Sequence, residues 1–270
     1  MRYHRTTGLM LSQMQELVCR VHGALSEPWH KKVGRPKTCG LYYAVEIACM
    51  YLRQNVTEEF LGDLRNISQS TVSRIVTVLV PLVKSVLEEF VPTAQDALEM
   101  VHGRVCLVDG AITPCWSYGD HGELWSRKHG TTGFNTQLIS LLDGEAVYVS
   151  DPLPGSTHDA KAFTTTPVVE IIRNSGGGIA DKGYQGCDRE CPECTVATPR
   201  KTPRGGELGK KDKESNAAIS ALRAPVERLI AHFKSWRIFY ADYRRPYHTY
   251  RDSFDAARAL FFFSISWGFE

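Results

Sequence analysis

The sequence has almost no net charge and no long apolar segment. Lys and Arg total 32 against 30 Asp and Glu, and the formal charge of +2 indicates no class of partner. The most apolar late segment, Ala259 to Trp267, is too short to span a bilayer. The start, Met1 to Arg5, lacks the apolar run of a signal peptide. We therefore expect a soluble, cytoplasmic protein with no membrane partner and with its eight cysteines reduced.

Several catalytic signatures are also missing. There is no G-x-S-x-G nucleophile turn and no phosphate-binding P-loop, so no side-chain nucleophile and no small-molecule cofactor are expected. Cys187, Cys191 and Cys194 have the spacing C-x3-C-x2-C. Zinc sites usually have four ligands in paired spacings, and a fourth is not evident here. Free thiols in a loop are the expectation, with a zinc site as the alternative.

The basic residues are unevenly distributed along the chain. Residues 200–251 contain thirteen Lys and Arg against five Asp and Glu, a local charge of +8 that leaves −6 for the rest. Such an imbalance indicates either a surface that faces a polyanion or a solvated face.

Residues 57–79 have the pattern of a helix-turn-helix. Thr57 is a good N-cap for a first helix, a tight turn follows at Asn66, and Ser68 caps a second helix. Pro81 is expected to kink or end that second helix. Its predicted buried face comprises Val72, Ile75, Val76 and Leu79, and its outer face Gln69, Ser70, Ser73, Arg74 and Thr77. Such an outer face suits base edges and phosphates in a major groove, although an ordinary helical hairpin is the alternative.

The remaining chain predicts an α+β protein with a second domain. A boundary at Val91-Pro92 separates an all-α DNA-binding domain, residues 1–92, from a mixed-sheet domain, residues 93–270. The expected strands are 104–110, 134–142 and 145–150, which form a meander, followed by a strand that ends at Asp181 and a fifth over 195–200. This order is the connectivity of a ribonuclease-H-like fold. An apolar C-terminal helix, 254–267, is expected to cover the sheet.

Three carboxylates fall at the positions that such a fold makes useful. Two buried strands are expected to end in aspartate, at Asp109-Gly110 and at Asp181 within Gly178 to Gly186. On a late helix, Arg223, Glu227 and Lys234 share one stripe at the border of the apolar face, unless the helix restarts at Pro225. Oxygen ligands from two strands and a helix suit two Mg²⁺ or Mn²⁺ ions and phosphodiester chemistry. A cap, a turn and a surface charge would explain the same three acids.

The chain resembles the DDE-type transposases of bacterial insertion sequences, in the branch related to Harbinger-type nucleases. The motifs that carry this resemblance are Val108-Asp109-Gly110, Leu153 to Asp159, Ala180 to Gly186, Arg223 to Glu227 and Lys234 to Arg237. The resemblance implies that Asp109, Asp181 and Glu227 are the catalytic, metal-binding triad. It implies that Arg223, Lys234 and Arg237 bind DNA, and it places Ser220 where relatives have a tyrosine. His158 and Asp159 match a family motif too, but Asp159 could equally be a helix N-cap.

The combined interpretation is a transposase that acts as a homo-oligomer on DNA. It is expected to bind the terminal inverted repeats of its element, cleave a strand to free a 3′-OH, and join that 3′-OH to target DNA. Two alternatives remain. One is a catalytically silent DNA-binding protein derived from a transposase. The other is a metal-dependent endonuclease without strand transfer.

Overall fold

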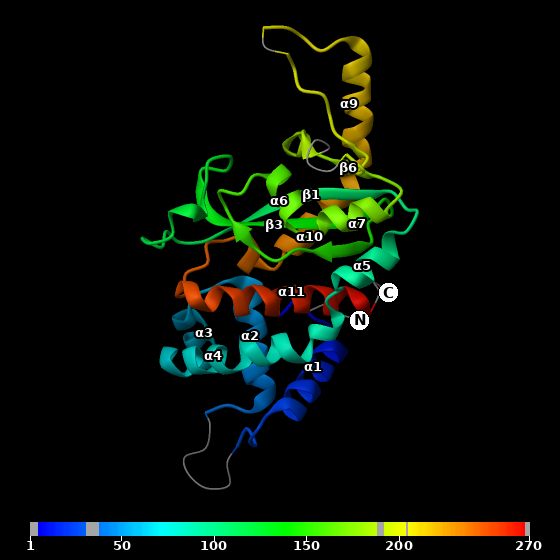
Figure 1. Cartoon of the computed structure of the whole chain (residues 1–270). Coiled ribbons are helices and arrows are strands. Elements are labelled where there is room, and N and C mark those ends of the chain that lie inside the picture. Colours follow the sequence, from blue (N-terminus) through cyan, green and yellow to red (C-terminus); the bar gives the residue numbers. More distant parts are fainter. Residues whose placement is uncertain (1–4, 31–37, 188–191, 204, 268–270) are drawn as a thin grey trace. The chain divides into compact units, whose positions relative to one another are not determined.

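The computed structural model describes residues 5–30, 38–187, 192–203 and 205–267, so Cys191 of the cysteine cluster lies outside the described residues. The chain divides into two compact units (Figure 1). Residues 1–91 and 234–270 form a helical unit, and residues 92–233 form a sheet unit. The first boundary lies at the predicted Val91-Pro92. The second differs from the expectation, because the C-terminal residues join the helical unit and not the sheet domain.

The α-helices of the helical unit bury apolar residues in a shared core, whereas the short helices Glu88–Phe90 and Tyr247–Thr249 bury none. The elements of this unit are α1 (Leu11–Ala24), α2 (Leu41–Gln54), α3 (Glu58–Arg65), α4 (Gln69–Val86), η1 (Glu88–Phe90), η4 (Arg237–Phe239), η5 (Tyr247–Thr249) and α11 (Tyr250–Ser266). Helix α11 packs against α4, so its aromatic residues belong to the core of this unit, whereas the sequence assigned the helix to the sheet domain.

Local hydrogen bonds explain why α3 and α4 begin and end where they do. The Thr57 hydroxyl accepts from the Phe60 amide at 3.2 Å, and the Ser68 hydroxyl accepts from the Thr71 amide at 3.3 Å. Asn66 ends α3 in the left-handed conformation, with φ of 51°. A β-carbon on Gly62 would lie 2.7 Å from the carbonyl oxygen of Ile67, so the turn needs glycine there. The predicted caps and turn are confirmed.

Helix α4 does not end at its proline. Pro81 removes one intrahelical hydrogen bond, yet the helix continues to Val86. Val80 and Val83, on either side of the proline, are both buried, and this packing holds the helix together across it. Of the two predicted effects of Pro81, an end of the helix is therefore wrong, and a kink stays a prediction.

The sheet unit has one mixed sheet. Its strands are β1 (Cys106–Pro114), β2 (Trp125–Ser126), β3 (Thr131–Leu141), β4 (Ala146–Val149), β5 (Leu153–Pro154), β6 (Gly178–Ala180) and β7 (Val196–Ala197). Strands β3 and β1 are antiparallel, whereas β1, β6 and β7 run parallel, in the order β2-β3-β1-β6-β7 with β4 and β5 also on β3. This is the predicted ribonuclease-H-like connectivity.

Helices cover both faces of this sheet (Figure 1). The helices of this unit are η2 (Gly122–Leu124), α5 (Ala94–Val101), α6 (Asp159–Thr165), α7 (Val168–Asn174), η3 (Lys182–Tyr184), α9 (Lys210–Leu222) and α10 (Ala224–Lys234). Phe163 of α6 and Ile172 of α7 pack with Val108 on one face, and Val226 of α10 packs with Leu107 on the other. Helix α9 buries none of its residues and projects from the sheet unit. In the described part of the chain, no helix is both long enough and apolar enough to cross a membrane.

Candidate functional site

The register of two parallel strands brings Asp109 and Asp181 together. Val108 of β1 pairs with Ala180 of β6, so each aspartate is the next residue after a paired position on neighbouring strands. Such strands lie about 4.8 Å apart. Strand β6 ends immediately before Asp181 as predicted, but β1 runs on to Pro114. Asp109 therefore lies within its strand, because β3 continues to pair with β1 beyond it.

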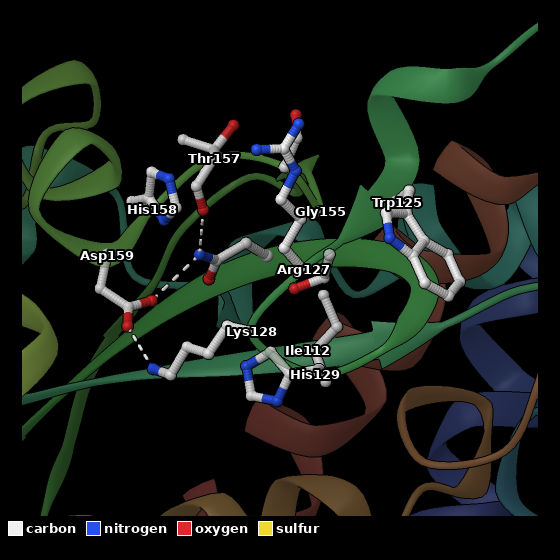
Figure 2. Close-up of a pocket in the computed structure, with 12 residues that line it drawn as sticks. Ile112, Trp125, Arg127, Lys128, His129, Gly155, Thr157, His158 and Asp159 are labelled. Carbon is white, nitrogen blue, oxygen red and sulfur yellow. Dashed lines mark hydrogen bonds and ion pairs between the residues drawn. The ribbon is translucent and has the colours of Figure 1, made fainter.

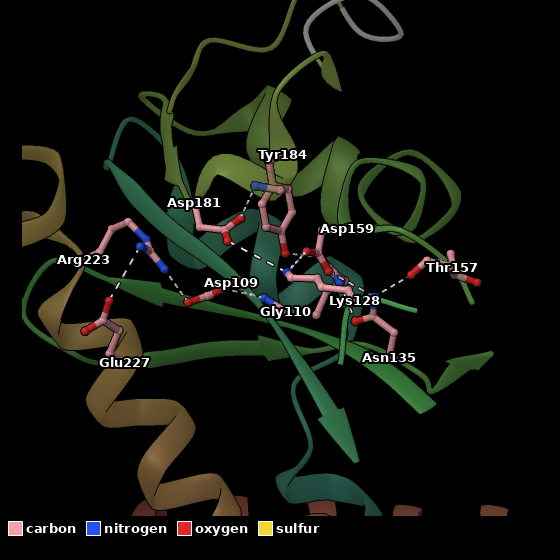
Figure 3. Close-up of polar contacts among 12 residues, drawn as sticks. Asp109, Gly110, Lys128, Asn135, Thr157, Asp159, Asp181, Tyr184, Arg223 and Glu227 are labelled. Atoms are coloured by element: carbon pink, nitrogen blue, oxygen red, sulfur yellow. Dashed lines mark hydrogen bonds and ion pairs between the residues drawn. The ribbon is translucent and has the colours of Figure 1, made fainter. Parts of the chain in front are cut away.

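Strand alternation aims both aspartates toward α10. Leu107 and Ile179, two residues before each aspartate, pack against Val226. The aspartates therefore share the α10 side of the sheet edge, and Glu227 follows Val226 at that border. Figure 3 shows the three carboxylates along this edge. The predicted position of Glu227, at the border of the buried face, agrees with the structure.

Backbone amides orient both aspartates. The Gly110 amide donates to Asp109 Oδ1 at 2.8 Å, and the Gly183 amide donates to Asp181 Oδ1 at 2.7 Å. The second oxygen of each carboxylate faces a cationic side chain. Arg223 Nη2 lies 2.5 Å from Asp109 Oδ2, and Lys128 Nζ lies 4.0 Å from Asp181 Oδ2.

The junction between α9 and α10 sets the position of Arg223. It is the C-cap of α9 and keeps helical dihedrals, and its carbonyl accepts from the Glu227 amide at 3.2 Å. Pro225 falls in the first turn of α10, where its missing N–H needs no partner. Arg223 Nη1 therefore reaches Glu227 Oε1 at 3.6 Å, and one guanidinium bridges two of the three carboxylates. The helix does restart at this point, but Arg223 keeps its predicted alignment with Glu227.

Asp159 is a fourth carboxylate at the same edge, and its side chain is not a cap. His158 is the N-cap residue of α6, and Asp159 is the first helical residue with only 6% of its side chain exposed. Lys128 Nζ donates to Asp159 Oδ2 at 2.5 Å (Figure 2), and Asn135 Nδ2 donates to Asp159 Oδ1 at 3.1 Å. The cap alternative for Asp159 is therefore wrong, and its match to the family motif stays a prediction of a role in the site.

Asn135 is itself held by a hydrogen-bonded chain of polar side chains from β3 and η3. Gln137 Nε2 donates to Asn135 Oδ1 at 3.0 Å, and the Tyr184 hydroxyl donates to Gln137 Oε1. Burial raises the pKa of Tyr184 well above its ordinary value, and the nearby Asp159 adds to this, so the hydroxyl stays a donor. Lys128, Asn135, Gln137 and Tyr184 were absent from the sequence prediction. Asn135 and Gln137 could have been found as polar residues at buried positions of a strand. Tyr184 lies within the Ala180 to Gly186 motif, and Lys128, in an exposed turn, carried no such signal.

Two glycines make room for Asp159. A β-carbon on Gly110 would lie 2.7 Å from Asp159 Oδ1, and one on Gly183 would lie 2.5 Å from Asp159 Oδ2. No side chain fits either position while Asp159 stays in place. Both glycines follow an expected strand end, and the close approach of Asp159 gives each of them a packing reason.

The site concentrates negative charge that its basic residues offset. Burial raises the pKa of Asp109; Arg223 opposes that rise, and the charge of Asp181 adds to it. Burial lowers the pKa of Lys128, but its bond to Asp159 and the nearby carboxylates outweigh this and raise it overall. Oriented carboxylate oxygens are the ligands that Mg²⁺ and Mn²⁺ prefer, so the donor chemistry fits a divalent ion. Among the described residues no three potential ligands already converge on one point.

The remaining predicted DNA-binding residues lie in two places. Lys234 is the last residue of α10, about two turns beyond Glu227, and Arg237 is exposed at the start of η4. On α4, all four predicted inner residues are buried, whereas Gln69, Ser70 and Arg74 are exposed. Ser73 and Arg74 line an open groove of about 830 Å³. Gln69 Nε2 donates to Glu58 Oε2 at 2.6 Å, which fixes its side chain to α3.

Comparison with known proteins agrees with this geometry. Residues 108–260, more than half of the chain, match the family described as DDE superfamily endonuclease. The chain belongs to this family. Residues 48–89, which include α3 and α4, match the helix-turn-helix of DDE superfamily endonucleases.

The names of two similar proteins refer to insertion sequences. The chain is 27% identical over 208 residues to a candidate transposase for insertion sequence element IS112 from Streptomyces albus G, covering 76% of this chain and 73% of the relative. It is 26% identical over 253 residues to the probable transposase for insertion sequence element IS702 from Microchaete diplosiphon, covering 92% and 89%. The predicted resemblance to DDE-type insertion-sequence transposases with a helix-turn-helix is confirmed.

Proposed function

We propose that this endonuclease-family protein is the transposase of an insertion sequence. The observation that carries the proposal is the placement of Asp109 and Asp181 side by side on neighbouring strands, each oriented by a backbone amide, with Glu227 linked to Asp109 through Arg223. The family match and the names of both relatives support the same class of chemistry.

The proposed reaction consists of two phosphoryl transfers at one site. Water attacks a phosphodiester at the element's end, and the 3′-OH leaves. That 3′-OH then attacks a phosphate of target DNA, and the target's own 3′ oxygen leaves. Asp109, Asp181 and Glu227 would hold two divalent ions, Mg²⁺ or Mn²⁺. Bound ions would supply Lewis-acid stabilisation of the attacking and leaving oxygens.

Arg223 has to move for Asp109 to take up this role. Arg223 Nη2 lies 2.5 Å from Asp109 Oδ2, the carboxylate oxygen that does not accept from the Gly110 amide. A DNA phosphate offers the same guanidinium an alternative anionic partner. We therefore infer that Arg223 shifts from the carboxylates to DNA, which agrees with the phosphate-binding role that the family resemblance implies.

The helix-turn-helix would recognise the terminal repeats. Gln69, Ser70, Ser73 and Arg74 form the outer face of α4, and three of them are exposed. Short polar side chains with one arginine suit base edges and phosphates in a major groove. The basic residues of 200–213 add salt-dependent affinity for any sequence, and the active protein is a homo-oligomer on DNA.

Cleavage assays with terminal-repeat DNA test this proposal. Asp109→Ala and Glu227→Gln should abolish Mg²⁺-dependent cleavage while each variant still binds the DNA. Retained cleavage in either variant would overturn the assignment. A substrate with a pre-cut 3′-OH end then tests joining, since an endonuclease without strand transfer would cut the intact end but leave the pre-cut end unjoined.

A further inference from the structure

The C-terminal segment between η4 and η5 contacts the helix-turn-helix within the helical unit. Arg245 Nε lies 3.5 Å from Glu58 Oε1, at the start of α3. Arg245 Nη2 also donates to the Thr77 hydroxyl of α4 at 2.9 Å, 168 residues away in sequence. The same guanidinium lies 6.0 Å from the centre of the Tyr51 ring of α2. One arginine therefore contacts α2, α3 and α4 together.

Glu58 links this arginine to the outer face of α4. Its Oε1 faces Arg245, and its Oε2 accepts from Gln69 Nε2 at 2.6 Å. The side chains of Glu58 and Arg245 are only 14% and 17% exposed, whereas Gln69 is exposed. A hydrogen bond to an ionised group is stronger than one between neutral groups. The mostly buried pair therefore holds the amide of an exposed side chain in one position.

The Glu58 carboxylate also decides which way that amide points. A carboxylate only accepts hydrogen bonds, so the amide nitrogen of Gln69, and not its oxygen, has to face Glu58. One hydrogen of Nε2 is used in this contact. The other hydrogen and Oε1 remain for a ligand, so Gln69 presents one donor and one acceptor side by side.

This pair of groups matches adenine and mismatches guanine. In the major groove adenine has an acceptor at N7 and a donor at N6, and a glutamine amide can bond to both. Guanine has acceptors at N7 and O6, so Oε1 of a fixed amide would meet an acceptor. Gln69 is the first residue of α4, and the N-terminal residues of a recognition helix are those that contact base edges.

Arg245 explains how a carboxylate can lie so close to DNA. An unpaired acid at this position would repel the phosphates of the duplex, and the guanidinium offsets its charge. Residues 234–270 also belong to the same compact unit as residues 1–91. The segment that follows the sheet unit in sequence is therefore part of the support of the recognition helix.

We propose that Gln69 reads one adenine of the terminal repeat, and that Glu58 and Arg245 are positioning residues that exclude guanine at the same base pair. The proposal rests on the proposed function, because it assumes that α4 enters the major groove of the element's ends. It adds the identity of one base, and it gives the C-terminal segment a share in sequence specificity.

Selection of preferred sites from a pool of random-sequence duplex DNA tests this inference. The full chain binds the pool without divalent ions, and the bound duplexes are sequenced. Wild type should enrich a motif found at the element's ends, with adenine at one position where Gln69→Ala has no preference. Glu58→Ala should accept guanine as well as adenine at that position, a loss of about five- to a hundredfold in discrimination. Arg245→Ala should relax the same position to a smaller extent.

The matched control is Glu59→Ala. Glu59 is also an acid in the first turn of α3, but it is exposed, so the substitution removes the same charge without touching Gln69. It should keep the wild-type motif. Glu58→Gln keeps an oxygen that can accept from Gln69, so it should retain part of the discrimination.

Three results would contradict the inference. An unchanged motif in both Gln69→Ala and Glu58→Ala would overturn it while the proposed function stands. Equal loss of preference at every position in Glu58→Ala would show that Glu58 only stabilises the fold. A wild-type chain that enriches no motif would overturn the inference and the proposed function together. A thermal melt of each variant identifies loss of folding, and Gln69→Ala with Glu58→Gln then decides the outcome.

Discussion

The outer face of α4 and the carboxylate edge of the sheet are built in opposite ways. On α4, Gln69, Ser70 and Arg74 are exposed, and hydrogen bonds within a few residues position the helix. At the sheet edge, Asp109 and Asp159 are mostly buried, and their partners come from distant parts of the chain. The first surface is formed by local structure and the second by tertiary structure. Substitutions should accordingly act on binding alone in the first, and on chemistry and stability together in the second.

Separating binding from cleavage gives the largest expected effects. Asp181→Asn keeps the shape of the side chain but removes its charge. Loss of a residue that only supports a metal ligand lowers activity by about 10- to 100-fold, and loss of the ligand Asp181 itself should lower the cleavage rate by more than this. Its affinity for terminal-repeat DNA should stay unchanged. Arg74→Ala should weaken that affinity by about 1–3 kcal/mol and leave the cleavage of saturated complexes intact. Equal loss of both properties in either variant would remove the distinction between the two regions.

Lys128 tests whether residues behind the triad contribute to chemistry. Lys128→Ala leaves Asp159 buried with one cationic partner fewer, so its carboxylate should lose its fixed position. We expect cleavage to fall by about 10- to 100-fold. Lys161→Ala, on the exposed side of α6, is the matched control and should have no effect. Equal rates for both variants would show that the Lys128 pair is only structural.

Gly110 tests the packing of the same edge. Gly110→Ala places a methyl group 2.7 Å from Asp159 Oδ1 and 3.2 Å from Gln137 Nε2, so one of these groups has to move. Overpacking of this kind costs about 1–3 kcal/mol, which urea unfolding of the full chain measures. Gly119→Ala meets no atom within 4 Å and should be close to neutral. A neutral Gly110→Ala would mean that Asp159 is not held where the structure places it.

The smallest effect is expected at the helix-turn-helix cap. Ser68→Ala removes the acceptor for the Thr71 amide and should cost about 1 kcal/mol of unfolding free energy. Ser68→Asp supplies another acceptor and should restore most of it. If Ser68→Ala and Ser68→Asp had the same stability, the cap would not be what positions α4.

The same contrast explains how far sequence reasoning reaches. The caps at Thr57 and Ser68 and the buried face of α4 follow from neighbours along the chain, so they could be predicted. The strand ending before Asp181 and the alignment of Arg223 with Glu227 are also local patterns.

What could not be predicted depends on partners far apart in sequence. Lys128 and Asn135 contact Asp159 only because β2, β3 and α6 meet at one edge. Asp109 lies within β1 because β3 pairs beyond it, which no feature of residues 104–110 reveals. The C-terminal aromatic helix could have packed on any apolar surface, and its sequence does not distinguish α4 from the sheet.

The central claim is that Asp109, Asp181 and Glu227 together hold divalent ions beside bound DNA. Binding of Mn²⁺ to the DNA complex, followed by electron paramagnetic resonance of the free ion, measures this directly. The account predicts that wild type binds Mn²⁺ and that Asp181→Asn and Glu227→Gln each weaken binding by at least about tenfold. Equal Mn²⁺ affinity in wild type and both variants would contradict it.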